Sequence, residues 1–268
     1  MSNSEEPEAL IKSRSKISVA AAIAAALLLS ACQNKSASLS ADPVNTASIS
    51  TGGPSFKKTE ALAKQWEQDN SNLEVGLAYS DSLGALDQRP TQLQVLKTLA
   101  DRNSQNAAVQ TKIGKKLLSI GEGQGAIETL ERATAMNPSD WQAFSALGTA
   151  YDQQTQHAQA REKYEAALAV KPGELSIMNN LAMSFALQGK LPEAERILRE
   201  ASANPASKSQ PRIRQNLALV VGLQGRFEES QKIASADLPP DQVQANLAYL
   251  QQMLSRKNTW AQLSDGQG

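Results

Sequence analysis

The sequence has little cysteine, little histidine and few aromatic residues, and neither sign of charge is in excess. One cysteine and one histidine occur among 268 residues, which excludes an intramolecular disulfide and a four-ligand Cys/His zinc site. Lysine plus arginine and aspartate plus glutamate both number 27, whereas a nucleic-acid binder normally has a basic excess that replaces counterions around phosphates. We therefore expect no nucleic-acid partner.

Alanine and leucine are abundant instead. Aromatic residues make up 4% of the chain and hydrophobic residues 41%, and the length suits one or two ordinary domains. Small and unbranched apolar side chains lose little rotamer freedom in a helix. The composition therefore favours an all-α fold of stacked helices over a sheet.

Residues 1–31 predict an export signal. A basic cluster around Arg14 ends its polar start, and an uncharged apolar run follows from Ile17 to Leu29. This run is too short to span a bilayer as a helix, which needs roughly 20 residues. The order of basic, apolar and small residues is typical of a secretory signal peptide.

The signal ends in Leu29-Ser30-Ala31-Cys32, which resembles the lipobox of bacterial lipoproteins. The resemblance implies cleavage before Cys32 and acylation of this residue, because several acyl chains hold a protein firmly at a membrane whereas one anchors it marginally. Gln33 stands where an aspartate would imply retention in the inner membrane, so the resemblance implies a lipid anchor in the outer membrane, facing the periplasm. The alternative is an ordinary signal peptide whose cysteine occurs by chance or is structural.

Residues 32–56 predict a flexible tether that begins at the lipidated cysteine. They consist largely of Ser, Ala, Thr, Asn, Gly and Pro, with almost no large apolar side chain. A coil of this length reaches roughly 25–30 Å from its anchor.

A period of 34 residues dominates the chain after the tether. Three contiguous units, 107–140, 141–174 and 175–208, align without a gap. Positions 7, 11 and 24 are large, and positions 8, 20 and 27 are small, so that helix axes can approach closely while large side chains fill the remaining space. In order of position the residues are Ile113, Leu147 and Leu181; Gly114, Gly148 and Ala182; Leu117, Tyr151 and Phe185; Ala126, Ala160 and Ala194; Leu130, Tyr164 and Leu198; and Ala133, Ala167 and Ala201.

This pattern resembles the tetratricopeptide repeat, in which each unit is a hairpin of two helices. The resemblance implies a solenoid of about 4–5 hairpins over residues 57–257. Weaker units are expected at 73–106 and 211–244, because one face of an end repeat meets water. Residues 258–268 are expected to form a frayed tail.

In tetratricopeptide proteins the first helices line a concave groove, and an asparagine at position 6 often bonds the backbone of a bound peptide. The resemblance therefore implies a protein-binding groove at position 6, which holds Lys112, Asn180, Asn216 and, in the last helix, Asn246. Positions 2, 5 and 9 add Gln142, Ser145, Thr149, Asn179, Met183, Arg212, Gln215 and Leu219. The alternative is that these asparagines only pack between hairpins or face solvent.

The sequence offers no motif for catalysis. The run Gly121-Glu122-Gly123-Gln124-Gly125 could suggest a phosphate loop, but such a loop follows a strand, and this run falls at an expected turn between helices. His157 falls at the next such turn and has no nucleophile motif to serve. We expect no enzyme activity, no cofactor and no metal.

The order of lipobox, tether, degenerate unit around Val75-Gly76-Leu77-Ala78-Tyr79 and repeats resembles the TadD-type lipoproteins of the Tad (Flp) pilus assembly and secretion system. The resemblance implies a pilotin-like role, in which the array binds a secretin or another pilus-assembly component and the lipid directs the complex to the outer membrane. Two alternatives stay open: an envelope scaffold for another machine, such as outer-membrane protein insertion or cell-wall synthesis, and an enzyme.

Overall fold

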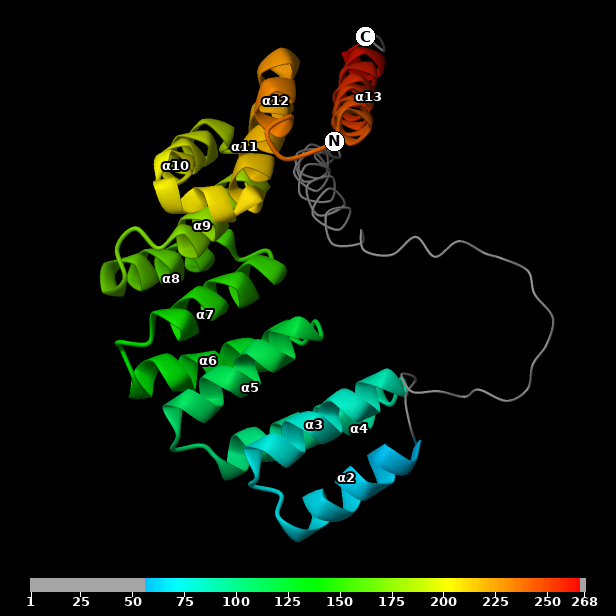
Figure 1. Cartoon of the computed structure of the whole chain (residues 1–268), viewed down its shortest axis with the longest axis vertical. Helices are drawn as coiled ribbons and strands as arrows, with labels where there is room; N and C mark the ends of the chain where they lie inside the picture. The colour runs from blue at the N-terminus through cyan, green and yellow to red at the C-terminus, as the bar shows by residue number, and fades with distance from the viewer. Residues whose placement is uncertain (1–55, 266–268) are drawn as a thin grey trace, which may run out of the picture. The chain divides into compact units, whose positions relative to one another are not determined.

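The computed structural model describes the backbone of residues 56–265 and the side chains as far as Ser255. The predicted signal, Cys32 and the tether before Phe56 lie outside the described residues. Over the described range the regular elements are helices, drawn in chain order from blue to red in Figure 1. They are α2 (Phe56–Gln68), α3 (Leu73–Ala85), α4 (Arg89–Arg102), α5 (Ala107–Ser119), α6 (Gly123–Met136), α7 (Trp141–Gln153), α8 (His157–Val170), α9 (Leu175–Leu187), α10 (Leu191–Ala203), the 3-10 turn η1 (Pro205–Ser209), α11 (Pro211–Leu223), α12 (Phe227–Ala234) and α13 (Pro240–Asp265).

The helices form two compact units, one holding α2–α7 and the other α8–α13. In the first unit α3 packs on α4 and α5 on α6, and α7 contacts both α5 and α6. In the second unit α9 packs on α10 and α11 on α12, and α11 also contacts α9. A first helix therefore contacts the next first helix in each unit, which confirms the predicted all-α solenoid of tetratricopeptide type.

The core consists of the residues at the small and large repeat positions. Ala126, Leu130 and Ala133 are all fully buried on one face of α6. A Cβ atom added to Gly114 of α5 would lie 2.5 Å from the Cγ of Leu130, so the missing side chain at position 8 is the space that the position-24 leucine fills.

Phe185 differs from the other residues at position 11, because it is only half-buried. The guanidinium carbon of Arg161 lies 4.9 Å from the centre of its ring, and the ammonium of Lys190 lies 5.9 Å from the same point. The exposed part of the ring therefore contributes cation–π contacts instead of core packing.

Position 20 changes from alanine to a polar residue in the two end hairpins. Gln92 Nε2 donates to the main-chain oxygen of Ser80 at 2.9 Å, and Ser230 Oγ donates to that of Ala218 at 2.7 Å. Both acceptors occupy position 8, so both end hairpins carry the same buried side-chain hydrogen bond between their helices. A buried polar group placed in this way is satisfied and holds the two helices together.

Each first helix ends in the same turn, with its position-15 residue in the left-handed conformation. The amide of the following residue bonds back to the last turn of the helix, as Glu122 does to Leu117 at 2.9 Å and Lys190 to Phe185 at 3.0 Å. This is the Schellman closure, which favours glycine at the left-handed position. The position-15 residues are Asp87, Gly121, Thr155, Gly189 and Gly225, with φ between 57° and 80°.

Replacing Thr155 with glycine is expected to stabilise the protein. A β-branched residue at φ 58° is strained, and removing this strain should raise the free energy of unfolding by about 1 kcal/mol. Gly189→Ala is the reverse control: its φ is 77° and a Cβ would meet nothing within 4 Å, so its cost of about 1 kcal/mol comes from the backbone alone. Urea unfolding followed by circular dichroism measures both. If Gly189→Ala loses stability but Thr155→Gly gains none, the backbone of Thr155 is not strained in the wild-type protein.

An ion-pair network joins α10 to α12 and the turn before it. Glu195 accepts from Arg226 at 2.7 Å, from Gln224 at 2.7 Å and from Arg199, and both arginines also bond Glu229. Burial alone would raise the pKa of Glu195 above its usual 4.5, but the hydrogen bonds from Arg226, Gln224 and Arg199 outweigh it and lower the pKa to about 2.

Glu195→Gln is expected to remove a pH-dependent part of the stability. Because the folded pKa lies below the unfolded value, the contribution is fully present above about pH 4.5 and is lost as the pH falls towards 2. At neutral pH the variant should be less stable by about 1–2 kcal/mol, less than the shift alone implies because the arginines are 41% and 44% exposed and screened. The urea midpoints of the wild type and of Glu195→Gln, measured across this pH range, should converge as the pH falls. Glu200→Gln, which alters an exposed pair with Arg196, should show no such trend, and a pH-independent gap for Glu195→Gln would contradict the prediction.

The last hairpin departs from the repeat at Asp237. Helix α12 ends at Ala234 after eight residues, and the Arg214 guanidinium binds the Asp237 carboxylate through two hydrogen bonds and the Ser207 main-chain oxygen through a third. Helix α13 follows, and its backbone is helical from Pro240 to Asp265. Val243, Leu247 and Leu250 form its buried face as far as the side chains are described.

Candidate functional site

The structure separates the predicted groove asparagines by exposure. Asn246 on α13 is exposed and Asn180 on α9 is half-buried, whereas Asn216 on α11 is only 8% exposed. Among the charged candidates, Lys112 on α5 and Arg212 on α11 are exposed. Gln215 on α11 is half-buried.

Asn216 is part of a ladder of carboxamides between α11 and α9. Its Nδ2 donates to Oδ1 of the buried Asn179 at 2.7 Å, and Asn179 Nδ2 lies 3.5 Å from Oδ1 of Asn180. A buried amide pair of this kind holds the two first helices in register. The side-chain donor of Asn216 is therefore used inside the fold, which favours packing between hairpins for this residue, while Asn180 keeps part of its surface in solvent.

The first-helix face of the α2–α7 unit contains an open hollow of about 450 Å³ between α5 and α7. Its lining combines groove positions from both helices with the aromatic residue that opens α7. The lining residues are Lys115, Leu118, Ser119, Trp141, Gln142, Ser145, Ala146, Thr149 and Gln153.

Local structure fixes the two sides of this hollow. Asp140 caps α7 by accepting from the amides of Gln142 and Ala143 at 3.0 and 3.1 Å, and its other oxygen accepts from Thr111 of α5 at 2.8 Å. The cap therefore positions the first turn of α7, with Trp141, against α5. Lys115 Nζ donates to Gln142 Oε1 at 3.4 Å across the hollow.

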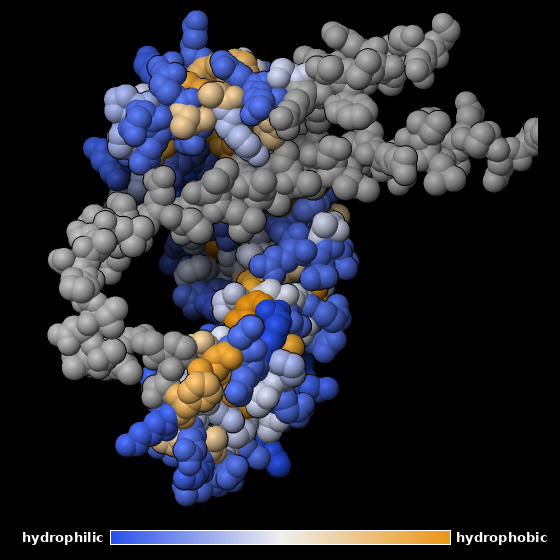
Figure 2. Space-filling model, turned by 90° about the vertical axis from the view of Figure 1, so that its right-hand side faces the viewer, coloured by the Kyte–Doolittle hydropathy of each residue, from blue (hydrophilic) through white to orange (hydrophobic). Residues whose placement is uncertain are grey.

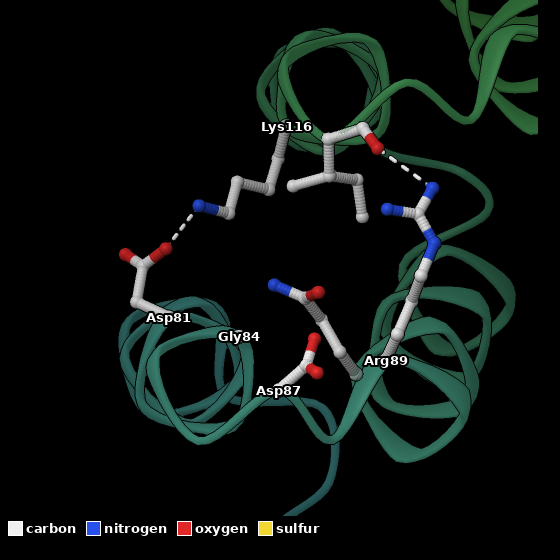
Figure 3. Close-up of a pocket in the computed structure, with 7 residues that line it drawn as sticks. Asp81, Gly84, Asp87, Arg89 and Lys116 are labelled. Atoms are coloured by element: carbon white, nitrogen blue, oxygen red, sulfur yellow. Dashed lines mark hydrogen bonds and ion pairs between the residues drawn. The ribbon is translucent and has the colours of Figure 1, made fainter. Parts of the chain in front are cut away.

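A second hollow, of about 360 Å³, lies where α3 ends, α4 begins and α5 ends. Figure 3 shows the Lys116 ammonium paired with Asp81 on one side and the Arg89 guanidinium bonded to the main-chain oxygen of Ile120 on the other. Arg89 also pairs with Glu122 at 2.6 Å. The polar groups here bond neighbouring hairpins to each other, so their role is structural.

One face of the molecule is seen in a space-filling view. Figure 2 shows hydrophilic residues over most of the face it presents, with hydrophobic residues gathered in a band across its lower part, which carries α2–α7.

In the described range, no group of three or more His, Cys, Asp or Glu side chains is placed to hold a metal ion. No helix described in the structure is both long enough and apolar enough to cross a bilayer.

The helical hairpins of the described residues have the fold of a tetratricopeptide-repeat solenoid. Residues 111–158 and 145–208 match the tetratricopeptide repeat family, whose arrays mediate protein–protein interactions and are typically non-catalytic scaffolds. No curated protein matches the sequence.

Two solved structures illustrate the likeness of fold. One is PilW, a widely conserved type IV pilus biogenesis factor, with a TM-score of 0.54 and 16% identity over 73% of this chain and 89% of that chain. The other is a thermophilic tetratricopeptide protein of Thermus thermophilus, with a TM-score of 0.51 and 21% identity over 67% of this chain and 98% of that chain. At these identities the likeness is one of fold alone.

From the sequence, Gln142, Ser145 and Thr149 were expected in the groove, whereas Trp141 and Leu118 were not. These two supply the large apolar surface of the hollow. Trp141 had a local signal, since it directly follows Asp140 after Asn137-Pro138, where a helix is expected to begin. Leu118 had none, because its neighbour Leu117 occupies the core position.

Proposed function

We propose that this protein is a non-catalytic envelope lipoprotein that assists the assembly and outer-membrane localisation of a Tad (Flp) pilus secretion channel. In this proposal Cys32 carries the lipid, residues 33–56 form a tether, and the repeats bind a segment of the secretin or of another pilus-assembly component in the periplasm.

The observation that carries the binding role is the open α5–α7 hollow on the first-helix face. It combines an exposed ammonium, several uncharged hydrogen-bonding groups and an aromatic side chain, which is the chemistry that an extended polypeptide needs for its side chains and its main chain. In the other unit, Asn180, Arg212 and Asn246 offer further polar contacts on first helices.

The pilus assignment rests on the resemblance of the lipobox, the tether and the repeat order to TadD-type lipoproteins. PilW, a type IV pilus biogenesis factor, is built on the same fold, which makes the fold suitable for such a role without specifying it.

Deletion of the gene tests the proposal. We expect detergent-resistant secretin multimers to disappear from the outer-membrane fraction or to stay in the inner membrane. Wild type should restore them and Cys32→Ser should not. Asn180→Ala combined with Asn246→Ala tests the accessible groove asparagines, and Asn216→Ala alone separates packing from binding because it should lower thermal stability.

Normal secretin assembly in the deletion strain would overturn the pilus role. The partner would then be sought among outer-membrane protein insertion or cell-wall synthesis machinery, by crosslinking from a photoreactive residue placed at Gln153 in the hollow.

A further inference from the structure

The lining of the α5–α7 hollow contains one charged side chain, and it is a cation. Lys115 is the charged residue among those that line it, and Lys112 lies exposed one turn earlier on the same helix. Helix α5 carries a third lysine, Lys116, which Asp81 neutralises, and it contains no acidic residue. The lining therefore holds a positive charge and no carboxylate, and the neighbouring carboxylate of Asp140 is occupied by hydrogen bonds from Thr111, Gln142 and Ala143.

Lys115 has a neutral acceptor instead of an ionic partner. Among the described side chains it pairs with no carboxylate, and its hydrogen bond goes to the Gln142 amide oxygen at 3.4 Å, which is long for a bond from an ammonium. A partner seated in the hollow would remove water from this ammonium. That desolvation is unfavourable unless the partner supplies an anion.

An apolar surface lies beside the ammonium. Leu118 of α5 and Trp141 of α7 line the same hollow, and so does the buried Ala146. A partly buried indole gives a large rigid contact area at low entropic cost, and such residues commonly dominate binding energy. The hollow thus accepts an aliphatic side chain next to an anionic one.

We propose that the α5–α7 hollow binds an extended acidic segment of its partner, in which a Glu or Asp carboxylate pairs with Lys115 and an adjacent aliphatic side chain packs on Trp141 and Leu118. This inference rests on the proposed scaffold role and specifies the chemistry of the segment that is bound. The cation of a basic segment would face the ammonium of Lys115 and would find no carboxylate in the lining to pair with. A neutral segment would leave that ammonium desolvated without an opposite charge.

Binding of a short fluorescein-labelled peptide to the full chain in detergent tests the inference by fluorescence anisotropy. The peptide alternates Leu-Glu and Gly-Ser pairs, and matched peptides carry Gln or Lys in place of Glu. We expect the Glu peptide to bind roughly tenfold more tightly than the Gln peptide, and its affinity to fall as salt screens the pair.

Substitutions locate the interaction. Lys115→Glu should weaken binding of the Glu peptide by about tenfold and Lys115→Gln by about threefold, whereas Lys97→Glu, an equal charge reversal at an exposed position of α4, should change it by less than about twofold. Trp141→Ala should weaken the binding of all three peptides, and circular dichroism checks that this variant folds. Equal affinity for the Glu and Gln peptides, preference for the Lys peptide, no measurable binding of the Glu peptide, or indifference to Lys115→Glu would each overturn the inference.

Complementation of the deletion strain separates this inference from the proposed function. If Cys32→Ser fails to restore the secretin and Lys115→Glu restores it fully, the pilus role stands and the acidic-segment inference falls. If the secretin assembles without this protein while the Glu peptide still depends on Lys115, the inference stands and the pilus role falls.

Discussion

Truncation of Leu130 to alanine is expected to destabilise the protein by about 3 kcal/mol, and Gly114→Ala should recover part of that loss. Leu130 is fully buried on α6, and its Cγ and both Cδ atoms fill the space in front of Gly114 on α5. In the wild-type background a Cβ at Gly114 would clash with these atoms, so Gly114→Ala alone should cost about 1–2 kcal/mol despite alanine's better helix propensity.

The double variant should be more stable than Leu130→Ala alone. With the leucine removed, the clashing atoms are gone, the alanine methyl group fills part of the cavity, and the double-mutant cycle should give a coupling of about 1–3 kcal/mol. Gly125→Ala is the matched control, because its Cβ would meet Leu117 at an ordinary 3.6 Å and should add independently of Leu130. Urea unfolding of the four proteins measures the cycle. If the stability lost in the double variant equals the sum of the two single losses within error, the two sites do not share one packing space.

Removal of the Arg214 guanidinium is expected to loosen the end of the second unit. Arg214 and Asp237 have side chains only 20% and 10% exposed, and Arg214 Nε donates to Asp237 Oδ2 at 2.7 Å. Arg214→Ala would leave the carboxylate mostly buried without its cation, at a cost of about 2–3 kcal/mol. Since Asp237 lies between α12 and α13, hydrogen exchange should accelerate in these two helices and remain unchanged in α9 and α10.

Arg196→Ala provides the comparison for this prediction. Arg196 and Glu200 form a pair on α10 with side chains 70% and 65% exposed, so its removal should cost less than about 0.5 kcal/mol and leave exchange in α12 and α13 unchanged. Uniform acceleration of exchange across α8–α13 in Arg214→Ala would mean that the ion pair supports the whole unit instead of its end.

The repeat made the fold predictable because it recurs with one period and depends on side-chain size. Residues such as Ala126, Leu130 and Ala133 lie at their expected positions and are buried as a tetratricopeptide hairpin requires. Each of these assignments depends only on residue positions within one 34-residue unit, and the three aligned units show the same pattern. The turn positions could be predicted for the same reason, since Gly121 and Gly189 occur at the same position of their units.

Two of the features that the sequence did not reveal are pairs of residues outside the repeat pattern. Asn216 occupies a groove position, but its partner Asn179 belongs to the preceding unit and to a different repeat position, so only the structure reveals their hydrogen bond. Arg214 and Asp237 pair where the repeat has already broken down. Thr155 adopts a glycine conformation that its own chemistry disfavours, and the surrounding helix ends impose it.

The turn that closes each first helix has a consequence for how such a chain can change in evolution. The closing hydrogen bonds run between residues of the same hairpin, as from Glu122 to Leu117 and from Lys190 to Phe185, and require nothing from the neighbouring hairpins. Duplication or loss of a whole 34-residue unit therefore leaves the remaining turns intact. The groove can lengthen or shorten by whole hairpins, and each added hairpin brings a new first-helix face whose exposed polar residues can diverge.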